Sequence, residues 1–385
     1  MTTEARATAA DPVPDPLFGD YPARLAPLGI EAPGRRARPE LDARLAACRM
    51  PAEWEPHERT LLTWPTRQVL WDGLLAEAKR EFAAVVRGVA DFEPVTVLAP
   101  PGCRPEVLDA TGSAGVDVFE VDVDDSWIRD NGPLVVTGPG GLRLGVDFRF
   151  NSWGEKFLPF DRDAAASAVV LDHLGIERIP VDMVLEGGSI SIDGAGTLVT
   201  TEQCLLHSNR NPDLSKADID AVLSGALGVS RVLWLPSGHV DDRHTDGHVD
   251  GVCTFTAPGR AIVQTCGDPR DVNHEAMARN LRYLRDNEDA AGTILGVRGL
   301  DLFPGFELNG VSDFVAYANF YVCNGAVIVP VSGRPDMDGE ALAVIAEEFP
   351  GREVIGVPAT IIAYGGGGPH CITMQIPLAG AAGSL

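Results

Sequence analysis

The chain has 385 residues, and 45% of them are apolar, which is enough for a substantial core in one large domain or in two or three smaller ones. Its 31 lysine and arginine residues stand against 55 acidic residues, for a formal net charge of −24. This balance argues against a nucleic-acid surface or an anionic-membrane surface. It would suit a small cationic substrate, although acidic proteins also gain solubility and salt tolerance from their charge.

The first 45 residues differ from the rest of the chain. Residues 1–45 are rich in Ala, Pro, Arg and Asp without a steady apolar period, so we expect a loosely ordered N-terminal extension. No low-complexity linker follows, and we expect residues 46–385 to form a single α/β domain. Strand-like runs recur there at residues 95–99, 116–121, 142–148, 189–192, 197–200, 232–235, 261–265, 326–331 and 361–364.

Helical patterns fall between these runs. The clearest helix is expected over residues 73–90, where Leu74, Ala78 and Phe82 begin an apolar repeat and Asp72 is placed to cap the first turn. Five or six strand-rich units, each accompanied by one helix, would suit a pseudo-symmetric ring of blades. Further helices are expected at residues 162–174, 214–227, 272–287 and 339–349.

A polar segment at residues 124–133 follows a strand-like run and ends in a turn signal. Its acidic residues, Asp130 among them, should therefore lie on a loop at a strand end, which is a common place for site residues. A structural interpretation stays open, because aspartates commonly cap turns and Arg129 could simply pair with a neighbour.

Glu186 precedes two glycines and follows an apolar run, so its carboxylate is either exposed at a strand end or directed into a pocket. The glycine-rich residues 193–197 predict a hairpin turn just beyond it. We interpret the later segment at residues 201–212 as structural, with polar loop side chains that tie turns together.

Residues 239–250 contain three histidines and four aspartates. His244 and His248 have the spacing of helical zinc ligands, but Gly247 and the many aspartates argue against a helix, and no further zinc signature accompanies them. If the segment is instead extended, His248 and Asp250 point to the same face. One wall would then carry a general acid/base and a carboxylate.

The run of four glycines at Gly365–Gly368 is followed closely by His370 and Cys371. Glycine runs are usually kept where the backbone needs a positive φ or where a ligand approaches the main chain. An apolar strand-like run at residues 354–363 leads in and a shorter one at 372–376 leads out, which places Cys371 at a rim. Without further context, Cys371 would be read as a small buried hydrophobic residue.

The chain has seven cysteines, an odd number, and they are widely spaced without a CxxC pair, so we expect reduced thiols. Neither an 18-residue apolar segment nor a secretory signal is visible, and the cytoplasm is the expected compartment. Reduced thiols leave open that one of them is a nucleophile.

Together these segments offer a thiol (Cys371), an imidazole (His248) and three carboxylates (Asp130, Glu186, Asp250). Carboxylate pairs match the planar N–H fork of a guanidinium group in charge and geometry, and a thiolate suits the electrophilic carbon at its centre. A pocket of acids would raise the pKa of the thiol. The bound cation or a charged His248 must therefore compensate.

Short motifs occur in one order at residues 50–57, 127–133, 150–154, 186–189, 209–212, 248–250, 317–321 and 366–373. As an ordered set they resemble the agmatine deiminase family, within the superfamily of guanidino-group-modifying enzymes that also contains arginine deiminases, peptidylarginine deiminases and amidinotransferases. The resemblance implies an α/β fold in the form of a five-bladed pseudo-symmetric propeller, with one catalytic domain and the site at its centre.

The resemblance also implies roles for individual residues. Cys371 would be the nucleophile, His248 the general acid/base, and Glu186 a further acid near the imidazole. Asp130 and Asp250 would grip the guanidinium nitrogens. Trp127 and Gly367 would contact the substrate.

The implied default reaction converts agmatine to N-carbamoylputrescine and ammonia through a covalent thiouronium intermediate, without a metal or an organic cofactor. The expected partner is thus a small cationic guanidino compound, with no nucleic acid and no membrane, and a homodimer stays open. Gly368 and Pro369 depart from the usual family residues before the catalytic dipeptide. Another guanidino compound or a peptidyl-arginine is therefore an alternative substrate.

Three alternative functions stay open. An amidinotransferase would pass the thiouronium carbon to an amine rather than to water. A pseudoenzyme would bind guanidinium without turnover, which the intact candidate residues disfavour. A metallohydrolase built on His244 and His248 is the least favoured.

Overall fold

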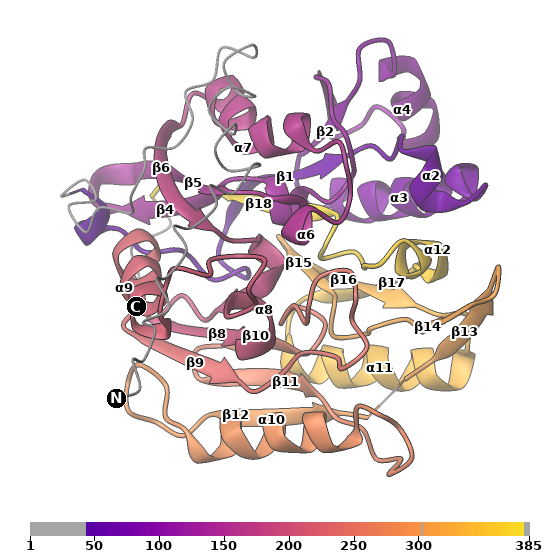
Figure 1. The fold of residues 1–385 in the computed structure, drawn as a ribbon. Coiled ribbons are helices and arrows are strands. Elements are labelled where there is room, and N and C mark those ends of the chain that lie inside the picture. Colours follow the sequence, from indigo (N-terminus) through magenta and orange to yellow (C-terminus); the bar gives the residue numbers. More distant parts are fainter. Residues whose placement is uncertain (1–43, 302, 381–385) are drawn as a thin grey trace, which may run out of the picture.

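A computed structural model describes residues 44–301 and 303–380 of the chain (Figure 1). Apart from Arg44 and Leu45, the expected N-terminal extension lies outside the described residues. In the described part, the strands form five sheets of three or four strands and one separate hairpin. Helices connect the strands within each sheet, so the fold is the mixed α/β fold that the sequence predicts.

The five sheets repeat one pattern, in which an antiparallel pair of strands is followed by a helix and by a strand parallel to the second of the pair. The helix supplies the crossover that two parallel strands require. In hydrogen-bonded order the sheets are β18 (Thr373–Pro377), β1 (His57–Thr63), β2 (Val95–Ala99) and β3 (Val116–Glu120); β4 (Leu134–Gly138), β5 (Leu142–Arg149) and β6 (Glu177–Val184); β7 (Ile190–Ile192), β8 (Thr197–Thr201) and β9 (Arg231–Leu235); β10 (Cys253–Ala257), β11 (Arg260–Gln264) and β12 (Gly296–Leu300); and β15 (Tyr321–Cys323), β16 (Ala326–Val331) and β17 (Glu353–Pro358).

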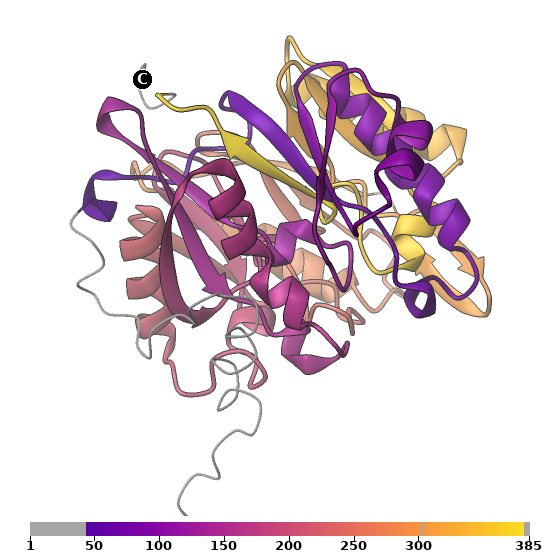
Figure 2. The ribbon, with the colours of Figure 1, turned by 90° about the horizontal axis from the view of Figure 1, so that it is seen from above.

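The first sheet joins the two ends of the described chain. β18, the yellow strand in Figure 2, pairs antiparallel with β1, and Leu61 lies opposite Met374. All of β18 and five of the seven residues of β1 are buried. This pairing fixes the segment around Cys371 against the start of the domain, because β18 begins two residues after the cysteine.

The helices vary from one turn to four turns. The long ones cross between strands. As the apolar repeat predicts, α3 (Leu75–Ala90) buries Ala78, Phe82, Val85 and Val89, and they belong to a core that also includes residues of β2, β16 and β17. The separate hairpin consists of β13 (Gly305–Leu308) and β14 (Val311–Phe314). The other helices are α2 (Gln68–Trp71), α4 (Arg104–Thr111), α5 (Ile128–Asn131), α6 (Ser152–Glu155), α7 (Asp161–Leu174), α8 (Glu202–Leu205), α9 (Lys216–Leu227), α10 (His274–Asp286), α11 (Pro335–Glu348) and α12 (Thr360–Tyr364).

Two local predictions are wrong. The run at residues 361–364, predicted as a strand, is helix α12, because Glu81 on α3 accepts the backbone N–H groups of Ile361 and Ile362 at 2.9 Å each. Asp72 does not cap α3, since it adopts a left-handed conformation (φ 41°) at the end of α2. The other expected strands and all the expected helices are present, with ends shifted by a few residues.

Within the described residues, we find no helix whose length and apolar character would allow it to cross a membrane.

The core under α3 provides a test of the packing. Phe82 is fully buried and meets Trp71 edge to face at 5.8 Å between ring centroids. Phe82→Ala should lower the free energy of unfolding by about 3–5 kcal/mol, because it removes a buried ring and leaves a cavity. Denaturant titration measures this loss. The control Val69→Ala, at a position that is 81% exposed, should change stability by less than about 0.5 kcal/mol.

Candidate active site

All five expected catalytic residues are buried and lie close together. A cavity of about 760 Å³ is lined by His248, Asp250, Gly367 and Cys371, among others. A narrower recess, which also reaches Cys371, is lined by the side chains of Asp130 and Trp127. The cavity and the recess therefore both reach Cys371, and each of the other residues named lines one of the two. Glu186 is completely buried.

Cys371 lies directly before β18. Asn319 donates a hydrogen bond from Nδ2 to Cys371 Sγ at 3.2 Å, and Sγ lies 3.4 Å from Asp250 Oδ2. Burial, followed by the charges of Asp250 and Asp130, raises the pKa of the thiol well above its usual value. In the free protein the thiol is therefore protonated at neutral pH, as expected for a cysteine among acids.

The glycine run is needed for close approach to this thiol. A Cβ on Gly367 would lie 2.5 Å from the Trp127 ring and 3.0 Å from Cys371 Sγ, and one on Gly368 would lie 2.5 Å from Asn319 Oδ1. Any side chain at these positions would displace Cys371 or its neighbours. The glycines therefore act through the absence of a side chain, as predicted for a backbone in contact with a site.

His248 lies in an irregular loop between β9 and β10, so the conditional expectation of an extended segment is wrong. Turns nevertheless bring His248 and Asp250 to the same cavity wall. His248 Nδ1 lies 3.8 Å from Asp130 Oδ1, and Nε2 lies 3.9 Å from Glu186 Oε2. Although burial opposes the charge, Asp130 and the neighbouring Cys204 and Glu186 raise the pKa of His248 well above its usual value.

Asp130, His248 and Asp250 converge on Gly188. A Cβ on Gly188 would lie 2.7 Å from His248 Nδ1, 2.8 Å from Asp130 Oδ1 and 2.9 Å from Asp250 Oδ2. The Gly188 backbone also bonds to two of them, because its N–H donates to Asp130 Oδ1 at 2.9 Å and its carbonyl accepts from the Asp250 N–H at 3.2 Å. Only glycine lets these three groups approach one another.

Asp130 is held by Trp153 as well, whose indole Nε1 donates to Asp130 Oδ2 at 2.9 Å. Burial raises the pKa of Asp130 to about 6 in spite of the nearby His248. A carboxylate in this position is poorly compensated without a further cation. The free site therefore favours the binding of positive charge.

His370 joins Asp250 to a second carboxylate that the sequence analysis did not assign to the site. His370 Nδ1 lies 2.9 Å from Asp250 Oδ2, and Nε2 lies 2.7 Å from Glu53 Oε1. Glu53 also accepts from Arg129 Nη1 at 3.3 Å, and its pKa falls to about 2 although burial opposes this. Both ring nitrogens of His370 contact a carboxylate, which fits a charged imidazole. Burial and Arg129 lower the pKa of His370, but Glu53 and Asp250 outweigh them, so this pKa is raised.

Comparison with known proteins places these residues in a family. The model of the Porphyromonas-type peptidyl-arginine deiminase family matches residues 49–377. The chain belongs to this family.

Relatives and structural neighbours of the family agree with this assignment. The chain is 39% identical over 364 residues to an agmatine deiminase from Pseudomonas aeruginosa, covering 89% of this chain and 98% of the relative. It is 40% identical over 352 residues to one from Stutzerimonas stutzeri, covering 85% and 95%. A structure of agmatine deiminase from Enterococcus faecalis has a TM-score of 0.83 and 32% identity, covering 90% of this chain and all of that one. The resemblance noted in the sequence is thus confirmed.

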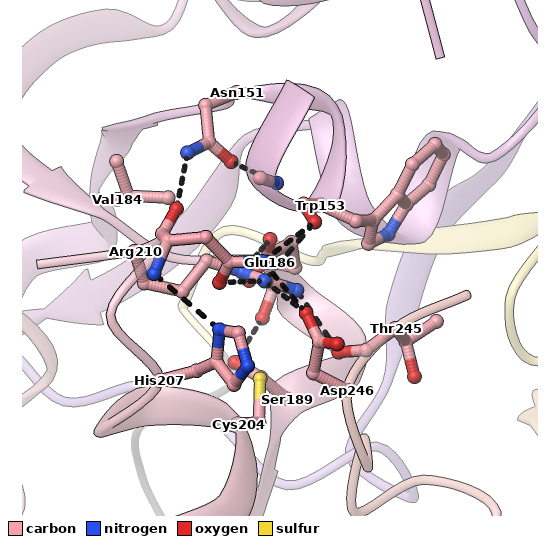
Figure 3. A network of polar contacts seen from close by, with 12 residues as sticks. Asn151, Trp153, Val184, Glu186, Ser189, Cys204, His207, Arg210, Thr245 and Asp246 are labelled. Atoms are coloured by element: carbon pink, nitrogen blue, oxygen red, sulfur yellow. Dashed lines mark hydrogen bonds and ion pairs between the residues drawn. The ribbon is translucent and has the colours of Figure 1, made fainter. Parts of the chain in front are cut away.

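In this family member, Arg210 is the centre of a buried network around Glu186 (Figure 3). Its Nε donates to Glu186 Oε1 at 2.6 Å, and Nη1 donates to Asp246 Oδ2 at 2.6 Å. Arg210 also donates to the carbonyl groups of Trp153 at 3.1 Å and Thr245 at 2.9 Å. The segment interpreted as structural does tie loops together, and it also holds a candidate site carboxylate.

The network determines the ionisation and the orientation of Glu186. Its pKa is lowered although burial opposes ionisation, because Arg210 and His248 stabilise the charge. One oxygen, Oε1, is bound to Arg210, and Oε2 is left toward His248. A signal for Arg210 was present in the motif at residues 209–212, but its partner could not be read from the sequence.

Removing Arg210 should therefore destabilise the protein. Arg210→Met leaves Glu186 as an uncompensated buried charge and should lower the free energy of unfolding by about 3–5 kcal/mol in a denaturant titration. The control is Arg270→Met, which removes an exposed pair with Asp268 and should leave the unfolding transition close to that of the wild type. Equal losses in the two variants would contradict a special role for the Arg210 network.

The protonated state of Cys371 predicts selective labelling. At pH 7 the neutral reagent 2-chloroacetamide should alkylate Cys371 slowly, because only the thiolate reacts. The cationic 2-chloroacetamidine should react at least about tenfold faster, since its positive charge favours the thiolate form of Cys371. Peptide mass spectrometry gives both rates, with the partly exposed Cys103 as the internal reference. Equal rates of the two reagents at Cys371 would contradict the acidic environment described above.

Proposed function

We propose that the chain is a guanidine deiminase, a hydrolase of an amidine C–N bond, whose substrate is agmatine and whose products are N-carbamoylputrescine and ammonia. The observation that carries the proposal is the convergence of Asp130, His248 and Asp250 at Gly188, beside the Cys371 thiol. Two carboxylates and a thiol at one point suit the charge and shape of a guanidinium group. Membership of the family and the curated agmatine deiminases at 39% and 40% identity support the same reaction.

In the first half-reaction, Asp130 and Asp250 bind the guanidinium nitrogens. The positive charge lowers the pKa of Cys371, and its thiol proton passes to solvent. The thiolate then attacks the guanidinium carbon to form a C–S bond. His248, which carries a proton in the free site, gives it to the departing nitrogen as the C–N bond breaks. Ammonia leaves, and a thiouronium adduct stays on Cys371.

In the second half-reaction, His248 is neutral and takes a proton from a water molecule that attacks the thiouronium carbon. The new C–O bond forms, the C–S bond breaks, and the remaining hydroxyl proton of the intermediate passes to the departing sulfur, which restores the Cys371 thiol. The product is a urea, which carries no charge. It therefore loses the electrostatic attraction to Asp130 and Asp250, which favours its release.

The cavity wall supports a substrate with a cationic tail. Besides Asp250, four aspartates line the cavity (Asp241, Asp242, Asp271, Asp313), and they outnumber its two arginines. Agmatine has an ammonium group at the end of its tail, whereas free arginine has a carboxylate there as well. The charge of the wall therefore favours agmatine over arginine.

Deimination of peptidyl-arginine is the second candidate. The cavity of about 760 Å³ is in the range of sites for drug-sized ligands, and agmatine is smaller than such ligands. An amidinotransferase would use the same thiouronium adduct, with an amine in place of water. The experiment below separates these reactions.

We further infer that the five sheets are the blades of a five-bladed α/β propeller and that residues 46–385 form one catalytic domain. The repeated strand pattern and the pairing of β18 with β1 across the chain ends support this arrangement. The cytoplasmic location and the homodimer stay predictions.

The direct test is the release of ammonia by the purified protein from agmatine, free arginine and an arginine-containing peptide in buffer without an acceptor amine. Agmatine should be turned over fastest, because its tail suits the acidic wall. Cys371→Ser should abolish the activity with an unchanged far-UV circular dichroism spectrum, since the C–S bond can no longer form.

Other outcomes would redirect the proposal. Preference for the peptide would favour the second candidate. Ammonia release by Cys371→Ser at the wild-type rate would overturn the assignment of Cys371 as the nucleophile. Turnover that requires an added amine would indicate an amidinotransferase.

A further inference from the structure

Behind His248 lies a fully buried thiol that the proposed reaction does not use. Cys204, on α8, is completely buried, and its Sγ lies within 4.8 Å of a carboxylate oxygen of Glu186 and a ring nitrogen of His248. The three residues come from three different segments of the chain. Thr201 Oγ1 accepts the backbone N–H of Cys204 at 3.1 Å, which fixes the start of α8.

The atoms that face one another in this cluster lack hydrogen-bond partners. Glu186 Oε2 and both ring nitrogens of His248 have none among the described residues, although Nε2 and Oε2 are 3.9 Å apart. Both side chains are more than nine-tenths buried. A buried polar atom without a partner costs about 1–3 kcal/mol, so a ligand that satisfied several of them would be stabilised.

The three ligand types fit zinc. Zn²⁺ binds thiolate sulfur, imidazole nitrogen and carboxylate oxygen, and in a tetrahedral site its ligand atoms lie about 3.3–3.6 Å apart. The 3.9 Å between His248 Nε2 and Glu186 Oε2 is close to this range. Small rotations of the side chains would therefore complete the geometry, and the fourth position would stay open.

The surroundings also favour a dication. The carboxyl groups of Asp130 and Asp250 lie near the other ring nitrogen of His248, with Asp130 Oδ1 at 3.8 Å from Nδ1. Arg210 is the opposing cation, but it is bound at 2.6 Å both to Glu186 Oε1 and to Asp246. By holding Oε1, Arg210 orients Glu186 so that Oε2 stays available, as hydrogen bonds to ligating carboxylates do in metal sites.

We propose that Glu186, Cys204 and His248 form an inhibitory site for Zn²⁺. The ion displaces a proton from His248 and another from the Cys204 thiol, and it forms bonds to Nε2, Sγ and Oε2. His248 can then neither donate nor accept a proton. This consequence rests on the proposed function, whereas the binding of the ion does not.

The competing location is the nucleophile itself. Cys371 Sγ lies 3.4 Å from Asp250 Oδ2, and a thiolate there would also attract zinc. The two locations differ in which thiol binds the metal. Substitution of one cysteine at a time separates them.

The binding experiment uses Co²⁺ as a spectroscopic probe in place of Zn²⁺. The full chain with Cys371→Ser should develop the near-ultraviolet absorption of a thiolate bound to Co²⁺, and added Zn²⁺ should abolish this absorption. A second protein with Cys204→Ser in addition should lack it. Cys204→Ala, also in the Cys371→Ser protein, repeats the test with a different side chain, and far-UV circular dichroism checks the fold of each variant.

The activity experiment measures inhibition of ammonia release by Zn²⁺, relative to the basal rate of each variant. Cys204→Ser should require at least about 100-fold more Zn²⁺ than the wild type, because it removes a metal ligand. Cys103→Ser, which removes a partly exposed thiol elsewhere, should respond as the wild type does.

Two results would overturn the inference. One is a Cys371→Ser protein that develops no thiolate absorption with Co²⁺, or one whose absorption persists when Cys204→Ser is added. The other is equal inhibition of the wild type and Cys204→Ser. If the protein releases ammonia from no guanidine, the proposed function fails, and the Co²⁺ measurement still decides the metal site.

Discussion

The close approach of Asp130, His248 and Asp250 depends on the missing side chain of Gly188. A Cβ there would lie within 2.9 Å of an atom of each, so any other residue would force the three groups apart. The glycine backbone also binds Asp130 and Asp250 directly. Two carboxylates this close together repel each other, and either of them can be neutralised by taking up a proton. Further charged groups are needed to keep them ionised and in place. The rest of the buried polar structure can be understood from this requirement.

Those further charges come from two sides. On one side, His370 contacts Asp250 and Glu53, and Arg129 contacts Glu53 in turn. On the other side, Arg210 binds Glu186, which leaves one oxygen toward His248. Positive and negative groups thus alternate through the buried site. Burial and the neighbouring carboxylates raise the pKa of the Cys371 thiol well above its usual value. In the proposed reaction a bound cation lowers this pKa, which would link binding of the substrate to activation of the thiol.

Much of this arrangement was readable from the sequence. The ordered motifs brought together Cys371, His248 and the carboxylates, and the glycine run predicted a backbone in close contact with the thiol. The partners of these residues were not readable, because Arg210 is 24 residues from Glu186 and His370 is 317 from Glu53. The same limit explains the error at α12, whose first turn is capped by Glu81 from 280 residues away. Local pattern identifies reactive groups, whereas long-range contacts determine their ionisation and orientation.

The central claim is that Cys371 forms a covalent bond to the guanidino carbon. Acid quenching within the first turnovers on agmatine, followed by peptide mass spectrometry, tests it most directly. The account predicts an adduct with the mass of the substrate less ammonia, confined to the peptide that contains Cys371. Turnover without such an adduct in the first turnovers, or an adduct on another residue, would contradict it.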